Sequence, residues 1–309
     1  MIYTLTFNPS LDYTMELPEL VPGGMNRAHR AGITPGGKGI NVSMILDTLG
    51  MANTMLGFVA GFTGDEIERS LKASGHHSDF IRLKSGLSRI NVKLCSDASY
   101  AAGTAPTELN APGPAIDHDS LNALDAQLNR LSAGDVLVLS GSVPESLPVY
   151  TYQRILDSLK GRNVLTFVDT TGESLLSTLS CRPFLIKPNR QELEELFSTH
   201  IKLHNDVDRY AARLHELGAR NVLISLDGEG AVLLCEDGRY IYLEAPSGQV
   251  VNPVGAGDSM LAGFIYGWLS THDHMSAFRY AIAAGSASAF SSGLASKDDI
   301  MSLYRLQTK

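Results

Sequence analysis

This chain of 309 residues contains few cysteines, few basic residues and no long hydrophobic run. The three cysteines, Cys95, Cys181 and Cys235, are odd in number and widely separated, which favours reduced thiols over a disulfide framework or a zinc site. No apolar run approaches the roughly twenty residues that a membrane-spanning helix needs. The first residues lack the basic start and apolar centre of a signal peptide and are typical of a β-strand. We therefore expect a cytoplasmic protein with no membrane partner.

The deficit of basic residues limits the choice of partners further. Lysines and arginines number 25 against 33 aspartates and glutamates, which gives a formal net charge of −8. Nucleic acid and anionic membrane surfaces both favour a basic protein surface, so neither is expected as the main partner. An anionic substrate would need a local basic pocket.

Helical and strand patterns alternate regularly from residue 119 onward. Leucines at 121, 124, 128 and 131 share one helical face, and a buried strand follows at 135–140. Further strands are expected at 164–168 and 184–187. This alternation predicts a mostly parallel sheet with helices on both faces. Residues 1–309 are expected to form one α/β domain that carries a small appendage.

Two segments outside this alternation predict the appendage. Residues 13–33 contain a Pro-Gly-Gly turn between two β-like pieces, at 13–17 and 26–33. In the alternating strand at 88–96, Arg89, Asn91 and Lys93 share one face and aliphatic residues the other. Such a strand either covers a small core or lies between an anionic ligand and a partner surface. The second interpretation predicts a β lid formed by about 12–34 and 88–112.

The segment 250–268, VVNPVGAGDSMLAGFIYGW, joins a glycine turn, a carboxylate and an apolar helix. Apolar residues at helical spacing place a helix start near Asp258. Gly255 and Gly257 leave backbone N–H groups open, and with the helix dipole they can bind a transferring phosphoryl group. The alternative is that Asp258 only caps the helix.

A second glycine-rich turn, Gly36-Gly37-Lys38-Gly39, precedes a helix expected at 40–49. Such turns bind anions or sugar hydroxyls through N–H groups, and Lys38 adds a positive charge. The turn matches neither the phosphate-loop nor the dinucleotide fingerprint.

Three other sites follow predicted strands, and each has a plainer alternative. Asp12 could hydrogen-bond sugar hydroxyls, or it is an ordinary turn residue. Asn189 and Glu192 share one face of a helix start and could hold Mg²⁺ through water, or they cap that helix. The turn at 225–230 could hold nucleotide phosphates, or it is a hairpin turn.

Together, these motifs resemble the ribokinase-like PfkB family of sugar kinases, within it the group of 1-phosphofructokinases and tagatose-6-phosphate kinases. The similar motifs are GGKGIN at 36–41, N-x-x-E at 189–192 and GAGD at 255–258, and the resemblance covers nearly the whole chain. The strings RINVKL at 89–94 and NAPGP at 110–114 look most like 1-phosphofructokinases. The resemblance implies a doubly wound, mostly parallel sheet flanked by helices, with a β lid that forms a homodimer contact.

The resemblance also implies a role for each motif residue. Asp258 would be the catalytic base, and Gly255, Ala256 and Gly257 would form the anion hole. Arg27 and Arg89 would hold the phosphate already on the substrate. The other substrate contacts would be Asp12, Gly37, Lys38, Asn41, Asn91 and Asn110. The ATP site would comprise Lys187, Asn189, Ser225, Asp227, Gly228, Gly230 and Gly257. Glu192 and Asn189 would serve Mg²⁺.

The implied reaction is ATP-dependent phosphorylation of the 6-hydroxyl of fructose 1-phosphate. Two alternatives are a tagatose-6-phosphate kinase and a non-catalytic regulator that binds nucleotide or sugar phosphate. Asn252-Pro253 stands where relatives usually carry Asp-Thr, which in some of them helps to build a monovalent-cation site, so potassium activation is not expected. The loop at 97–106 is longer than usual and is expected to alter lid contacts or dimer shape.

Overall fold

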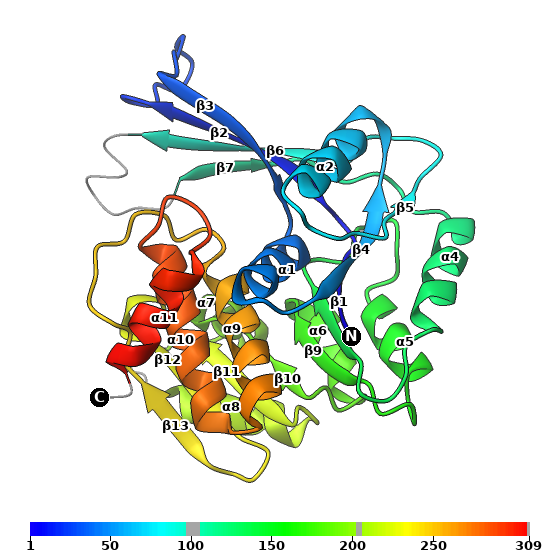
Figure 1. Ribbon diagram of the computed structural model, residues 1–309, viewed down its shortest axis with the longest axis vertical. Coiled ribbons are helices and arrows are strands. Elements are labelled where there is room, and N and C mark those ends of the chain that lie inside the picture. Colours follow the sequence, from blue (N-terminus) through cyan, green and yellow to red (C-terminus); the bar gives the residue numbers. More distant parts are fainter. Residues whose placement is uncertain (97–105, 202–205, 308–309) are drawn as a thin grey trace.

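The computed structural model describes residues 1–96, 106–201 and 206–307. Its centre is a nine-stranded sheet in the order β13-β12-β11-β10-β9-β8-β1-β4-β5 (Figure 1). The strands are β1 (Ile2–Thr6), β4 (Asn53–Val59), β5 (Ile81–Arg82), β8 (Val136–Ser140), β9 (Leu165–Asp169), β10 (Leu185–Ile186), β11 (Asn221–Ser225), β12 (Ala231–Leu234) and β13 (Tyr240–Leu243). The strands from β5 to β11 pair in parallel, whereas β12 and β13 are antiparallel. The predicted mostly parallel sheet is confirmed.

Helices cover both faces of this sheet. On one face lie α1 (Lys38–Leu49), α9 (Ala256–Thr271), α10 (His274–Ala289) and α11 (Lys297–Leu306). On the other lie α4 (His118–Leu128), α5 (Thr151–Ser158), α6 (Gly172–Leu179), α7 (Arg190–Phe197) and α8 (Val207–Glu216). Strand residues alternate between the two cores, with Val136 and Val138 in one and Leu137 and Leu139 in the other. A strand that is buried on both faces of a sheet needs apolar residues at consecutive positions, as here.

The small sheet has the order β3-β2-β6-β7 and lies over one end of the α/β body (Figure 1). Its strands are β2 (Ser10–Leu17), β3 (Arg30–Gly36), β6 (Arg89–Ser96) and β7 (Thr107–Asn110). The helix α2 (Gly61–Ala73) packs beside it. The second arm of the hairpin begins at Arg30 and not at Asn26, because the Asn26 side chain bonds back to Val21 and holds a loop there. Most of the loop at 97–106 lies outside the described residues.

The strand order places a topological switch between β1 and β8. From β1 the chain adds β4 and β5 on one side, and then β8 to β11 on the other. In open α/β sheets, ligands bind at the carboxyl ends of the strands where the order reverses. The first strand of the small sheet, β2, follows directly after β1 in the chain, so the small sheet lies over this point.

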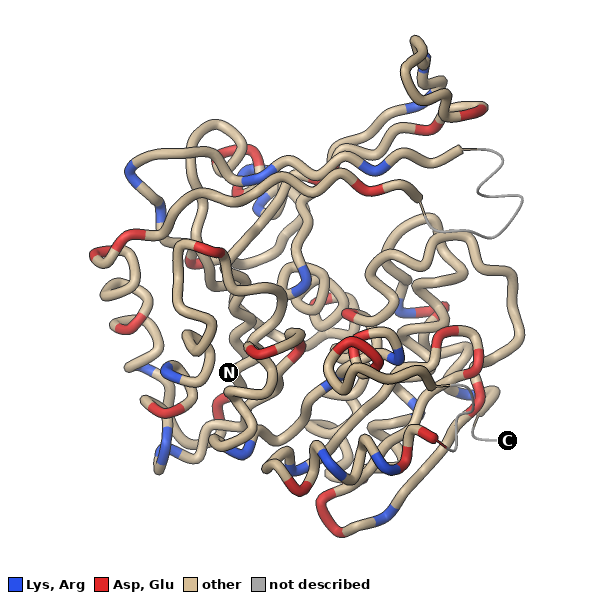
Figure 2. The backbone as a smooth tube through the Cα atoms, turned by 180° about the vertical axis from the view of Figure 1, so that it is seen from behind, with Lys and Arg blue, Asp and Glu red and all other residues tan. Residues whose placement is uncertain are grey.

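Acidic and basic residues interleave along the described backbone (Figure 2). Among the described helices, none is both long enough and apolar enough to cross a membrane.

Candidate active site

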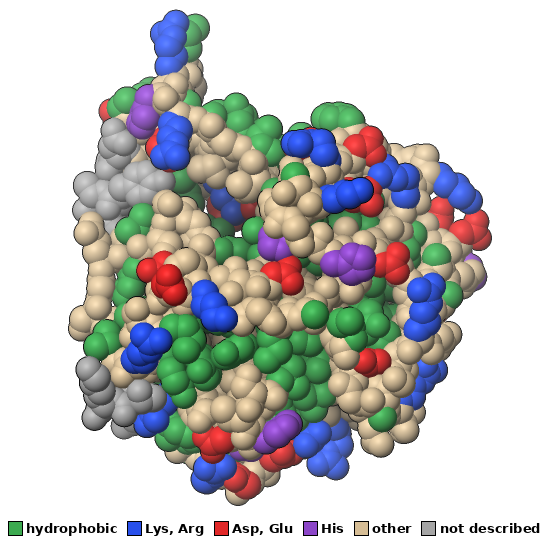
Figure 3. Space-filling view, viewed as in Figure 1, with side chains coloured by type: hydrophobic (Ala, Val, Ile, Leu, Met, Phe, Trp, Pro, Cys, Tyr) green, Lys and Arg blue, Asp and Glu red, His purple; other side chains and the backbone are tan. Residues whose placement is uncertain are grey.

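A cavity of about 240 Å³ opens at the switch point. Its walls come from the ends of β1, β8 and β9, from α1, α7 and the lid strand β6; the lining residues are Thr6, Asn8, Lys38, Arg89, Gly141, Ser142, Thr170, Thr171 and Glu192. In Figure 3 the surface is hollowed between the small sheet and the body below it. The parallel sheet thus brings segments far apart in sequence to one cavity.

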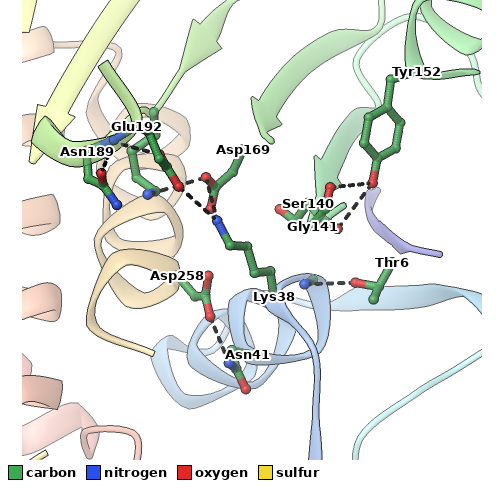
Figure 4. A network of polar contacts seen from close by, with 12 residues as sticks. Thr6, Lys38, Asn41, Ser140, Gly141, Tyr152, Asp169, Asn189, Glu192 and Asp258 are labelled. Carbon is green, nitrogen blue, oxygen red and sulfur yellow. Dashed lines mark hydrogen bonds and ion pairs between the residues drawn. The ribbon is translucent and has the colours of Figure 1, made fainter. Parts of the chain in front are cut away.

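Asp258 lies in the first turn of α9 and is 7% exposed. Its Oδ2 accepts a hydrogen bond of 2.7 Å from Asn41 Nδ2 of α1, as Figure 4 shows. Burial raises the pKa of Asp258 to about 6, while the nearby Lys38 ammonium opposes the rise. A carboxylate with this pKa is ionised at neutral pH and can still accept a proton.

Asp169, at the carboxyl end of β9, was not predicted as a site residue. It is fully buried, and its Oδ1 lies 3.3 Å from Lys38 Nζ and 3.4 Å from Lys187 Nζ. Burial opposes its charge, but the two ammonium groups hold the pKa of Asp169 below its usual range. The same carboxylate, with Asp258 and Glu192, raises the pKa of Lys38 against burial. Lys38 is therefore fixed beside Asp258 (Figure 4), and the Lys187 ammonium is also close enough to act on the charge of Asp258.

The first glycine turn is packed against the end of β1. The Gly39 N–H donates to Thr6 Oγ1 at 2.8 Å, and a Cβ on Gly39 would lie 2.2 Å from that oxygen. Gly37 caps α1 with a φ of 121°, which only glycine adopts readily. This close approach sets Lys38 and Asn41 at the cavity.

The second glycine turn starts α9 and faces the lysines. Gly255 has a φ of 81°, and a Cβ on Gly257 would lie 3.2 Å from Lys187 Nζ. The Ala256 N–H donates to Pro253 O at 3.2 Å, so this predicted anion-hole donor is already engaged within its own turn. Asn252 ties the turn to the loop after α10 through a 3.2 Å bond from its Nδ2 to Ser292 O.

Asn189 and Glu192 form a capping box at the start of α7. Asn189 Oδ1 accepts from the Glu192 N–H at 2.8 Å, and Glu192 Oε2 accepts from the Asn189 N–H at 2.9 Å. Glu192 Oε1 remains directed at the cavity, 3.7 Å from Lys38 Nζ. No cluster of three or more potential metal-ligating side chains (His, Cys, Asp or Glu) occurs in the described ranges. The capping box shows that both residues cap α7, and it leaves one carboxylate oxygen of Glu192 available to an ion bound through water.

The turn at 225–230 connects β11 to β12 as an antiparallel hairpin, which was the plainer alternative. It includes the short helix η2 (Asp227–Glu229), and Asp227 adopts a positive φ of 52°. A bridge between Ser225 and Asn189 sets the turn next to α7. Space is open around Gly228, whereas a Cβ on Gly230 would lie 2.1 Å from Leu243 O.

The lid contributes a polar face opposite the glycine turns. Asp12 is 9% exposed. Its Oδ1 accepts hydrogen bonds from Ser10 Oγ at 2.7 Å and from Asn91 Nδ2 at 3.2 Å. Its Oδ2 lies 2.6 Å from the Lys93 ammonium. Arg89 Nε donates to Asn8 O at 3.2 Å. Burial lowers the pKa of Arg89, and the charges of Asp12 and Glu108 oppose this shift.

Three buried oxygens of this region, Asn8 Oδ1, Asn91 Oδ1 and Asp169 Oδ2, have no hydrogen-bond partner within the described part of the chain. Buried acceptors normally find donors, and an unpaired one carries a free-energy cost. A ligand rich in hydroxyl groups would supply donors for them.

Comparisons with known proteins agree with this arrangement. Residues 5–300 match the model of the "pfkB family carbohydrate kinase". The chain belongs to this family of carbohydrate kinases. A "1-phosphofructokinase" of Bacillus subtilis is 40% identical over 98% of this chain and 97% of the relative. A "D-tagatose-1-phosphate kinase" of Bacillus licheniformis is 36% identical over 95% and 94%, respectively. The structure of Escherichia coli phosphofructokinase-2 in complex with fructose-6-phosphate has a TM-score of 0.90 and 28% identity, covering 100% of this chain and 99% of that one.

Most of the predicted residues of this pfkB kinase surround the cavity or adjoin it, but the structure does not bring Arg27 there. Arg27 lies exposed in the loop between β2 and β3, which projects away from the body (Figure 1). Asn110 is exposed on β7 at the edge of the lid, where the register pairs it with Asn91 and its Nδ2 donates to Glu108 Oε2 at 3.4 Å. The resemblance implied a substrate contact for Arg27, and similarity of sequence does not show how far the hairpin reaches from the core.

Asp169 and Lys93 are two charged residues that the sequence prediction omitted from the site. It also omitted the lining residues Thr6, Asn8, Gly141, Ser142, Thr170 and Thr171. A usable signal was present for Asp169, because it is the one carboxylate at the end of the predicted strand near 164–168. For Lys93 the alternation of β6 gave the right face but not its pairing with Asp12.

Proposed function

We propose that this pfkB kinase transfers the γ-phosphoryl group of ATP to the 6-hydroxyl of fructose 1-phosphate, with Asp258 as the base. The observation that carries the proposal is a buried carboxylate at a helix N-terminus, beside two fixed lysines and a cavity whose opposite wall carries Arg89. The relative from Bacillus subtilis named 1-phosphofructokinase supports the choice of substrate.

Asp258 has one oxygen free for the chemistry, because Asn41 donates to the other. The substrate hydroxyl loses its proton to the free oxygen as the new O–P bond forms, while the bond between the γ-phosphorus and the bridging oxygen breaks and ADP leaves. Phosphoryl transfer has a loose transition state, so the main requirements are alignment of the hydroxyl with the phosphorus and stabilisation of charge on the phosphoryl oxygens. Asp258 serves the alignment of the hydroxyl, because it is held in the first turn of helix α9.

The cations that would stabilise charge on the phosphoryl oxygens come from α1 and from the end of β10. Lys38 and Lys187 are held by Asp169, and Lys187 lies close to Gly257 in the first turn of α9. The helix dipole of α9 adds partial positive charge at the same point. The turn at 225–230 and Asn189 border this region, and we assign them to the nucleotide.

Mg²⁺ fits the remaining oxygen of Glu192 through bound water. Glu192 Oε1 lies 3.7 Å from the Lys38 ammonium, and the Asn189 oxygen is engaged in the capping box. When bound, the ion would neutralise charge on the nucleotide phosphates. Asn189 therefore serves by positioning Glu192.

The substrate would lie between the glycine turn of α1 and the lid. Arg89 is assigned to its existing phosphate, since arginine makes two charge-assisted hydrogen bonds to phosphate. Asp12 and Asn91 are assigned to sugar hydroxyls, and the unpaired oxygen of Asn91 supports this role.

A homodimer through the lid is also proposed. The outer face of the small sheet exposes Ile33 by 57%, Ile90 by 39% and Leu109 by 56%. The strand register places Ile33 and Leu109 on the same face, across Tyr13 and Val92. An apolar face of this kind favours association with a second copy. Residues 1–309 are proposed to be one domain in each protomer.

A second candidate substrate is D-tagatose 1-phosphate, since a relative with that activity in its name is 36% identical. It carries its phosphate at the same end as fructose 1-phosphate, whereas tagatose 6-phosphate carries it at the opposite end. Arg89 would serve either 1-phosphate equally, so the hydroxyl contacts of Asp12 and Asn91 would decide between the two sugars.

Release of ADP, measured with each sugar phosphate in turn, tests the proposal. The panel should contain fructose 1-phosphate, tagatose 1-phosphate, tagatose 6-phosphate, fructose 6-phosphate and unphosphorylated fructose. We expect the highest kcat/KM with fructose 1-phosphate. A higher value for either tagatose phosphate would transfer the assignment to that sugar, and no turnover with any of them would favour the regulator.

A further inference from the structure

Among the described residues of the lid, Lys93 and Asp12 form the shortest and least exposed ion pair. The ammonium of Lys93 lies 2.6 Å from Asp12 Oδ2, and the two side chains are only 14% and 12% exposed. On β7 the cross-strand neighbour of Lys93 is the exposed Glu108, but the Lys93 side chain pairs with Asp12 of β2 instead. A pair this sheltered from water is screened less than a surface pair.

Asp12 is also fixed in position. Ser10 Oγ and Asn91 Nδ2 both donate to its other oxygen. A Cβ on Gly36 would lie 2.5 Å from the carboxylate, so Asp12 directly underlies the glycine turn that leads into α1. Its negative charge therefore stands where a sugar phosphate would approach.

The charges around the cavity are otherwise matched. Asp169 pairs with Lys38 and Lys187, and Glu192 pairs with Lys38. Arg89 differs, because within the described ranges no carboxylate lies at ion-pair distance from it and its Nε donates to the backbone at Asn8. Asp12 is close enough to act on the charge of Arg89 through space. Without Lys93, Asp12 would be an uncompensated carboxylate next to the only cavity-lining arginine.

We propose that Lys93 is a specificity-determining residue that neutralises Asp12 and thereby keeps Arg89 free to bind the phosphate of a sugar monophosphate. This inference rests on the proposed function and adds the device by which the same site selects phosphorylated over unphosphorylated sugar. Asp12 can then bind hydroxyls without repelling the substrate dianion. Lys93 itself acts through Asp12 and Arg89.

The test is the ratio of kcat/KM for fructose 1-phosphate to kcat/KM for fructose. In Lys93→Met this ratio should fall by at least about tenfold, since a charged hydrogen-bonded partner is lost from a sheltered pair. Lys93→Arg keeps the charge and should restore most of the ratio. The KM for ATP should stay near the wild-type value in both variants.

Lys84→Met is the matched control, because Lys84 pairs with Asp119 at 3.0 Å where both side chains are 76% exposed. Its ratio should equal that of the wild type. A fall in the ratio with this control would mean that any lost lysine lowers it, and the inference would be overturned.

Asp12→Asn provides a second, opposite test that does not depend on Lys93→Met being stable. The variant should lower kcat/KM for both sugars through the weakened hydroxyl contact, but the ratio should rise because a negative charge is gone. An unchanged or lower ratio in Asp12→Asn would overturn the proposal, as would an equal loss on both sugars in Lys93→Met. If the wild type turns over no sugar phosphate, the proposed function fails; if it does so and only the ratios fail to move, the inference alone fails.

Discussion

At the residue scale, the site consists of charges that are buried and individually held. Asp258 is the clearest case, because burial raises its pKa to about 6 while the Lys38 ammonium and the hydrogen bond from Asn41 oppose a further rise. Asp169 shows the converse, since two ammonium groups keep its carboxylate ionised in spite of full burial. Mutations that change charge without changing shape should therefore separate the roles of these residues.

Asp258→Asn should lower kcat by at least about 100-fold while the KM values for ATP and sugar phosphate stay near normal, because a positioned base is lost but the shape is kept. In the wild type, kcat/KM should fall as the pH drops below about 6, where Asp258 takes up a proton and cannot accept another. Steady-state kinetics across pH measure both effects. The acid limb should be missing from the residual activity of the variant, and a variant that keeps most of its kcat would remove Asp258 from this role.

Arg89→Ala should reduce the use of sugar phosphate far more than the use of ATP. Losing a charged hydrogen-bond pair costs about 2–3 kcal/mol, so kcat/KM for fructose 1-phosphate should fall roughly 30- to 150-fold. The control is the weak activity on unphosphorylated fructose. An equal loss there would show that Arg89 only supports the lid, where its Nε contacts Asn8 O.

At the scale of elements, helix starts place the functional groups. α1 presents Lys38 and Asn41, α7 presents Glu192, and α9 presents Asp258, each after a strand or turn that ends at the same edge of the sheet. Close backbone packing fixes these starts. A Cβ on Gly263 of α9, for example, would lie 2.4 Å from Tyr280 O of α10, so the two helices touch along glycine.

Glu192→Gln tests the metal role of α7 without disturbing the helix, since Gln also serves in a capping box. The magnesium concentration for half-maximal rate should rise several-fold because a negative ligand becomes neutral. Glu195→Gln is the matched control, on the same helix but with an exposed side chain that accepts a hydrogen bond from Gln191. An unchanged magnesium dependence in Glu192→Gln would leave Glu192 as a helix cap alone.

At the scale of the whole molecule, the small sheet is only partly covered by its own chain, because α2 packs against part of its apolar side and leaves the rest exposed. Its polar side faces the cavity, and its other side exposes apolar residues. A single small sheet of this kind gains stability when a partner covers the open side.

Leu109→Lys should therefore shift the protein from dimer to monomer, because the residue is 56% exposed on that open side. Sedimentation velocity measures the change directly. Leu306→Lys is the control, since Leu306 is 64% exposed on α11 and away from the lid. A dimer that persists in Leu109→Lys would place the contact elsewhere, and a wild-type monomer would contradict the proposed assembly.

The sequence by itself determined the elements and their type. The change from alternating to helical periodicity predicted the parallel sheet, its helices and the lid strands, because burial on one or two faces is recorded in the local spacing of apolar residues. The glycine turns were equally predictable, since positions such as Gly37 and Gly255 require positive φ. The three motifs then located most of the site.

Only the tertiary structure decided which charges meet. Lys38 and Asp169 are separated by 131 residues and come together because β9 lies two strands from β1 in the sheet. Lys93 reaches Asp12 because β6 pairs with β2 in parallel, which periodicity alone cannot specify. Arg27 is left outside the cavity because its hairpin extends beyond the body. Local pattern fixes the face on which a side chain lies, whereas strand order and register fix the partner that it finds there.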